Sequence, residues 1–132
     1  MKKKKILHII GSMDDGGAQR VVLDYLERKS SLHKYDLEFL SLSPPTNSTY
    51  DVFIKNNNLL FTYLEYKRSN IRFSCMRKVI NWTRRTIVLY RFIQDHNVDA
   101  LHTHITPIFV DIIFILIIFK GKKFHTMHSD PY

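Results

Sequence analysis

The period of the hydrophobic pattern changes at Gly11, and this change restricts the fold more than any other feature of the sequence. Residues 5–10 form a short apolar run, KILHII, whose length and isoleucine content predict a buried strand. Beyond Gly11, apolar residues recur at helical spacing, at Ala18, Val21, Val22, Tyr25 and Leu26. The chain is therefore expected to open with a strand, a glycine-containing turn and a helix.

The same alternation continues to the end of the sequence. Further strands are predicted over residues 35–42, 60–64, 98–102 and 123–127, and further helices over residues 51–58, 71–96 and 107–119. Strands that alternate with helices favour a Rossmann-like parallel sheet with helices on both faces. With 132 residues, one α/β domain spanning 1–132 is expected.

The segment 108–119 is almost entirely apolar, with Asp111 as its single polar residue. Its 12 residues are fewer than the roughly 18–20 that span a bilayer. A buried crossover helix is predicted, and an interfacial or aggregation-prone segment is the alternative.

A surplus of basic residues, 20 Lys and Arg against 12 Asp and Glu, gives a net charge of +8 and favours anionic partners. Arg77, Arg84 and Arg91 recur every seven residues on one side of the long predicted helix. They are candidates for peripheral contact with an anionic membrane, and a solvated basic face is the alternative. Nucleic acid is not expected, because no recognised binding motif accompanies the charge.

Cysteine content and the amino terminus point to a cytoplasmic protein. Cys75 is the single cysteine, which excludes an internal disulfide and fits a reducing compartment. Residues 2–5 are basic, but the apolar run after them is interrupted by His8 and is too short for a signal peptide. A peripheral location at the inner face of the membrane would agree with the basic helix.

Gly16 and Gly17 precede the first predicted helix and form the first candidate site. Unpaired backbone N–H groups at a helix start, next to residues without side chains, can hold a phosphate or a sugar hydroxyl. The spacing matches neither GxGxxG nor the GK[ST] of a P-loop. An ordinary strand-to-helix turn therefore remains the alternative.

Histidines lie at the ends of the last two predicted strands: His102 and His104 at one, His125 and His128 at the other. If these strands are parallel neighbours, all four lie near one end of the sheet, where open α/β sheets bind ligands. Imidazole suits zinc, but His125 and His128 have opposite strand parity and no acidic ligand lies beside them. No metal is therefore expected.

Three segments together suggest a family: KILHIIGSMDDGGAQRVVLDYL, VDALHTHITPIFVDIIF and KFHTMHSDPY. They resemble the amino-terminal domain of family 4 glycosyltransferases of the GT-B fold. The family's Gly-Gly-Ala-Glu-Arg turn corresponds to residues 16–20, with Gln19 in place of Glu. The resemblance covers nearly the whole chain and implies an incomplete half of a GT-B fold.

This resemblance implies retaining transfer of a sugar from a nucleotide-sugar donor to a saccharide or lipid-linked acceptor, in polysaccharide or glycolipid biosynthesis. The donor is a substrate, and neither a cofactor nor a metal is implied. The family pattern carries substrate contact over to Gly16 and Gly17. It carries the catalytic position at the transferred sugar over to His125, with Thr126 beside it as a substrate-binding residue.

In this family the donor nucleotide is held chiefly by a second Rossmann-like domain with paired glutamates. The sequence stops at Tyr132, so we expect an acceptor-side half that is inactive alone and needs a second chain. Two alternatives stay open. One is a noncatalytic α/β module that binds an anion or a partner, and the other is a nonfunctional gene fragment.

Overall fold

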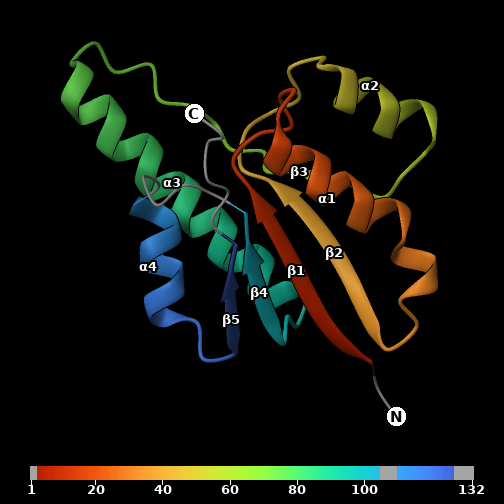
Figure 1. Cartoon of the computed structure of the whole chain (residues 1–132). Helices are drawn as coiled ribbons and strands as arrows, with labels where there is room; N and C mark the ends of the chain where they lie inside the picture. The colour runs from red at the N-terminus through yellow and green to blue at the C-terminus, as the bar shows by residue number, and fades with distance from the viewer. Residues whose placement is uncertain (1–2, 105–109, 127–132) are drawn as a thin grey trace.

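The computed structural model describes residues 3–104 and 110–126, whose centre is a sheet of five parallel strands (Figure 1). The strands are β1 (Lys4–Ile10), β2 (Tyr35–Ser41), β3 (Thr62–Tyr63), β4 (Ala100–Thr103) and β5 (Lys122–His125), in the spatial order β3-β2-β1-β4-β5. The predicted Rossmann-like parallel α/β fold is thereby confirmed. The third strand is shorter than the predicted 60–64.

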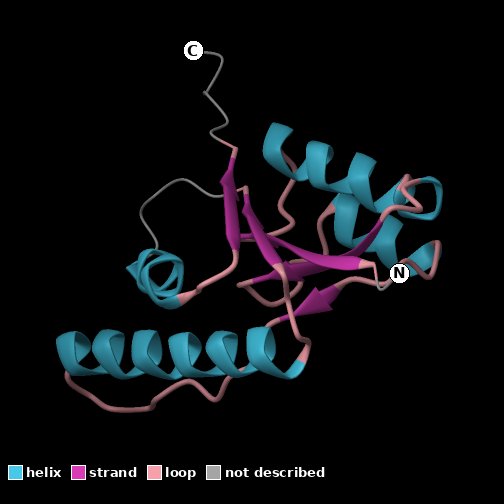
Figure 2. Ribbon diagram, turned by 90° about the horizontal axis from the view of Figure 1, so that it is seen from below, coloured by secondary structure: helices cyan, strands magenta, loops and turns pink. Residues whose placement is uncertain are grey.

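Helices cover both faces of this sheet (Figure 2). One face carries α1 (Gly17–Glu27) and α2 (Thr49–Asn56), and the other carries α3 (Ser74–Asp95) and α4 (Val110–Ile118). A short 3-10 turn, η1 (Lys29–Ser31), follows α1. Along the chain, each α-helix connects one strand to the next, which is the crossover that a parallel sheet requires.

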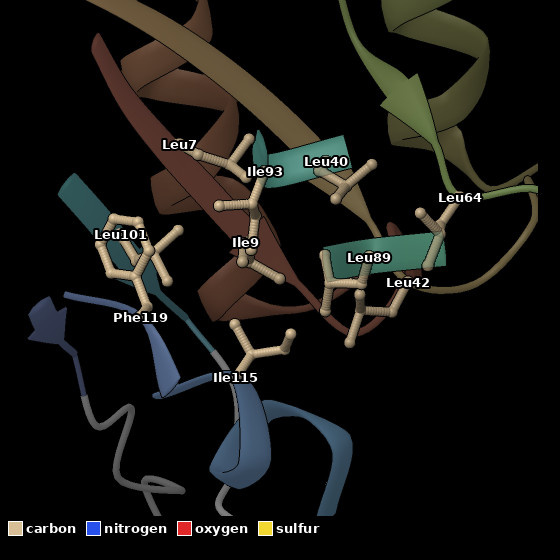
Figure 3. Close-up of a cluster of buried hydrophobic side chains, with 10 residues drawn as sticks. All are labelled: Leu7, Ile9, Leu40, Leu42, Leu64, Leu89, Ile93, Leu101, Ile115 and Phe119. Atoms are coloured by element: carbon tan, nitrogen blue, oxygen red, sulfur yellow. The ribbon is translucent and has the colours of Figure 1, made fainter. Parts of the chain in front are cut away.

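Alternate residues of the strands supply two hydrophobic cores, one under each pair of helices. In β1, Leu7 and Ile9 point toward α3 and α4, where they meet Leu89, Ile93 and Ile115 (Figure 3). The opposite face packs against α1 and α2 through a second cluster, formed by Ile10, Met13, Val22, Leu23, Leu26, Leu37, Phe39 and Ile54. The two-residue period of β1 therefore decides which side chains face which helix pair.

Only the carboxyl-terminal half of α3 packs on the sheet. Thr86, Leu89 and Ile93 are buried, whereas Cys75 and Val79 near the start of the helix are exposed. A helix of 22 residues is about 33 Å long, longer than strands of four to seven residues at about 3.3 Å each. The first turns of α3 therefore extend past the sheet (Figure 2).

The helix α4 is buried on one side only. Ile115 is 1% exposed in the core, whereas Ile113 and Ile117 are 45% and 73% exposed. The prediction of a crossover helix is confirmed, because α4 connects β4 to β5. The prediction that this helix is buried is wrong for its outer face, which no further layer covers within the described residues. Across residues 3–104 and 110–126, no helix is long and apolar enough to cross a bilayer.

Candidate functional site

The carboxyl ends of β1, β4 and β5 lie at one edge of the sheet because the three strands are parallel. The turn that contains Gly16 and Gly17 follows β1, His104 follows β4, and Thr126 follows β5. In open α/β sheets, ligands bind at this edge. The glycine turn after β1 and the predicted residues at the end of β5 therefore lie on the same edge of the sheet, with β4 between β1 and β5.

Neither glycine of the turn is required by backbone conformation. Gly16 is the N-cap of α1 in an extended conformation, and no described glycine has a positive φ. Apart from its chain neighbours and its own helix backbone, a Cβ atom on Gly17 would meet no atom within 4 Å, and the three atoms nearest to one on Gly16 all belong to the side chain of Gln19. Open space therefore lies over Gly17, at a helix start that no side chain in the described part of the chain caps.

Hydrogen bonds tie the glycine turn to the loop between β2 and α2. Asp14 accepts hydrogen bonds from the hydroxyls of Ser12, at 2.6 Å, and Thr46, at 2.9 Å, and together these bonds hold the pKa of Asp14 below its usual value. The hydroxyl of Thr49 donates to Asp15 at 3.2 Å. Two carboxylates therefore stand beside Gly16.

A cluster of three histidines, which we call the histidine triad, lies on the face covered by α1. His8 and His102 are paired across β1 and β4, and His104 lies two residues further along. Nδ1 of His8 is 3.1 Å from Nε2 of His104, and the ring centroids of His102 and His104 are 4.1 Å apart. One ring nitrogen of each histidine lies within 4.8 Å of the others.

The surroundings of the triad keep His8 uncharged. His8 and His104 are 4% and 3% exposed, and the rings of Phe39 and Tyr25 lie 4.9 and 5.1 Å from the ring of His8. Burial, with a smaller contribution from the nearby His102, lowers the pKa of His8 to about 3. Around neutral pH, His8 is therefore a neutral imidazole that can act as a ligand or a hydrogen-bond partner.

The two family-derived residues at the end of β5 separate to opposite faces of the sheet. Nδ1 of His125 is 2.7 Å from the hydroxyl of Thr103, on the side of α3 and α4. Thr126 instead contacts His102, with its hydroxyl 2.7 Å from Nε2, on the side of α1 and the histidine triad. Thr126 thus lies against the triad and His125 does not, while His128 is outside the described residues.

His8 is the site residue that sequence reasoning missed. It appeared only as a polar interruption of the first apolar strand, between Leu7 and Ile9. A histidine at a buried strand position is the signal that would have singled it out, because a buried polar side chain needs a partner. Its partner His104 lies 96 residues away and becomes apparent only once β4 is known to pair with β1.

The candidate membrane-surface arginines are all on the outside of the molecule. Arg77, Arg84 and Arg91 are exposed, and Nη1 of Arg84 donates to the backbone oxygen of Lys67 at 3.0 Å. Phe73, Met76 and Val79 in the same region are 73%, 55% and 53% exposed. Apolar and cationic side chains therefore share the surface at the start of α3.

Fold and site together define a Rossmann-like α/β domain with a polar, histidine-containing edge at the carboxyl ends of its strands. The chain matches no protein-family model, no curated protein and no solved structure with which it was compared.

Proposed function

We propose that this chain is the acceptor-side half of a retaining glycosyltransferase, which moves a sugar from a nucleotide-sugar to a saccharide or lipid-linked acceptor. The observation that carries the proposal is the open approach to Gly17 at the carboxyl edge of a parallel sheet. The resemblance of residues 16–20 to the turn of family 4 glycosyltransferases supports it. The cytoplasm is the proposed location.

The charges beside the turn favour a sugar hydroxyl over a phosphate as its immediate ligand. Asp14 and Asp15 lie directly before Gly16, and the low pKa of Asp14 keeps that carboxyl ionised. A carboxylate accepts a hydrogen bond from a hydroxyl but repels a phosphate. In the proposed role, the turn therefore binds hydroxyls of the acceptor or the transferred sugar, and the donor phosphates are held chiefly by a second domain.

The proposed roles of the residues at the end of β5 come from the family resemblance, and the chemistry of the side chains agrees with them. His125 is assigned to the reacting sugar, where an imidazole can donate a hydrogen bond or transfer a proton. Its hydrogen bond to Thr103 orients the ring from within the sheet. Thr126, on the triad side, is assigned to substrate hydroxyls at the same edge.

Binding of labelled nucleotide-sugars tests this proposal. A panel of radiolabelled UDP- and GDP-sugars is incubated with the chain alone, and then together with a candidate second Rossmann-like domain that carries paired glutamates. We expect retention of label and sugar transfer only in the combined sample, with both reduced by Gly17→Ala. Tight donor binding by the chain alone would contradict the proposal that a second domain holds the donor. Absence of sugar transfer in every combination would contradict the proposed glycosyltransferase activity.

We further propose peripheral contact with an anionic membrane through the beginning of α3. Exposed apolar residues and cations both strengthen the binding of a helix at an anionic lipid interface. Here Phe73 and Met76 supply the first, and Arg77 and Arg84 supply the second. Such contact would bring the carboxyl edge of the sheet near a lipid-linked acceptor.

A further inference from the structure

The spacing of the histidine triad resembles that of nitrogen ligands around one metal ion. Zinc binds histidine nitrogen at about 2.0–2.1 Å, and tetrahedral geometry then places two ligand nitrogens about 3.3 Å apart. Nδ1 of His8 and Nε2 of His104 are 3.1 Å apart, close to this separation. The third ligand atom, on His102, lies within 4.8 Å of both.

We propose that His8, His102 and His104 form a zinc-binding site whose fourth coordination position is open to water or an anion. His8 lies in β1, His102 lies in the neighbouring strand β4, and His104 directly follows β4. A packed sheet holds such ligands at fixed relative positions, as a metal site requires. This inference does not rest on the proposed glycosyl transfer.

The chemistry of the ligand set selects the ion. Three imidazoles without a carboxylate suit zinc and other late first-row metals, whereas magnesium and calcium prefer oxygen ligands. Three protein ligands also leave one tetrahedral position for a water or an exchangeable anion. An anion is favoured there because the ligands are neutral, the ion carries two positive charges and the chain has a net charge of +8.

Zinc binding requires an unprotonated nitrogen on each ring to face the ion. A neutral imidazole carries one such nitrogen, so each ring of the triad can offer one lone pair to the ion. In the hydrogen bond between His8 and His104, one of the two facing nitrogens carries the proton. A neutral imidazole can carry its proton on either nitrogen. When the proton moves to the far nitrogen, the facing nitrogens of His8 and His104 both offer a lone pair to zinc, and both rings stay neutral.

Zinc binding also requires a small movement of the imidazole rings, and His102 is the most accessible of the three. Because the widest separation is at most 4.8 Å, the rings must approach one another by up to about 1.5 Å to reach a tetrahedral edge. His102 is only half-buried, which gives zinc a route from solvent. Thr126, bonded to Nε2 of His102, stands where an outer hydrogen bond orients a metal ligand.

Zinc titration of the purified chain tests this site. After dialysis against chelator, zinc is added in competition with a chromophoric chelator, and cobalt is added separately to report coordination geometry by absorption. The same titrations are run on His8→Leu, His102→Gln and the control His33→Gln, which removes an exposed histidine outside the triad. Circular dichroism of each variant establishes whether it is folded.

We expect one zinc per chain, an intense tetrahedral cobalt spectrum and an affinity reduced at least 100-fold in both triad variants but unchanged in His33→Gln. Thr126→Val should weaken binding by roughly 10-fold, as for loss of an outer hydrogen bond. If His8→Leu does not fold, the half-buried His102→Gln decides. Absence of stoichiometric zinc, a weak octahedral cobalt spectrum, or equal affinity in His102→Gln and wild type would overturn the proposal.

Discussion

The Nζ atom of Lys5 lies 2.7 Å from Oε1 of Glu38, an ion pair that joins the central strand β1 to its neighbour β2. Nδ1 of His96, just after α3, lies 2.6 Å from the other carboxylate oxygen, Oε2. Burial by itself would raise the pKa of Glu38, but the hydrogen bonds from Lys5 and His96 outweigh it and hold that pKa below its usual value. Glu38 thus ties two strands to the end of α3.

Acid should remove the stabilisation that Glu38 supplies. A carboxyl whose pKa is lower in the folded than in the unfolded state stabilises the fold above its unfolded pKa, about 4.3 for Glu, and this contribution is lost as the pH falls through the folded pKa. We expect Glu38→Gln to lower the free energy of unfolding by about 1 kcal/mol at neutral pH and to reduce its acid dependence. Urea unfolding between neutral pH and about pH 3 measures both. The control is Glu27→Gln, at an exposed position at the end of α1. An equal acid dependence in wild type and Glu38→Gln would contradict the expectation.

Two neighbouring residues of α3 should differ widely in their importance for stability. Leu89 is fully buried in the core cluster beneath the sheet, whereas Ile87 is 45% exposed. We expect Leu89→Ala to lower the free energy of unfolding by about 2–5 kcal/mol, because it leaves a cavity, and Ile87→Ala to change it by less than about 0.5 kcal/mol. Chemical denaturation of both variants measures the difference. Equal losses would mean that α3 packs by another face.

Two glycine substitutions should separate a site role from a structural role. Alanine fits at Gly17, where its Cβ meets no atom, and should leave the free energy of unfolding unchanged or raise it by a few tenths of a kcal/mol. At Gly121 the added Cβ would lie 2.5 Å from both the backbone oxygen of Asp99 and the ring of Phe119, and should cost about 1–3 kcal/mol. Thermal unfolding of both variants provides the measurement. A destabilised Gly17→Ala would indicate that this glycine serves the fold and not a ligand.

Much of the fold could be predicted from the sequence because its elements have strong periodicity. The opening strand and helix follow from the change at Gly11. The observed β1 begins one residue before the predicted 5–10 and ends at the same residue, and α1 contains all five apolar residues that predicted a helix. The helix α3 was also predicted, but the length over which it is buried was not. Burial depends on how far the sheet reaches, and the sequence of α3 does not contain that information.

The candidate site was predicted only in part, for two different reasons. The separation of His125 from Thr126 could have been foreseen, since adjacent strand residues point to opposite faces. The contact of His8 with His104 could not, because it depends on β4 pairing with β1 and on their register. Local pattern gives neither strand order nor register.

Charge reversal on α3 tests the proposed membrane contact. Arg77→Glu, Arg84→Glu and Arg91→Glu are combined in one variant, and its sedimentation with vesicles of anionic phospholipid is compared with that of wild type. We expect wild type to sediment and the variant to lose most binding, since each cation near an anionic surface contributes about 1 kcal/mol. Salt should weaken the wild-type interaction in the same way.

Controls distinguish the apolar from the cationic part of this contact. Met76→Ser removes an exposed apolar side chain and keeps the charge, so it should weaken binding less than the triple reversal and should not change the dependence on salt. Charge reversal of Arg20 and Arg28, which lie on or beside α1 on the other face of the sheet, changes net charge without touching α3. If that variant loses as much binding as the triple reversal, the attraction comes from total charge and not from a docking surface on α3. Unchanged sedimentation of the triple variant would exclude α3 as the membrane contact.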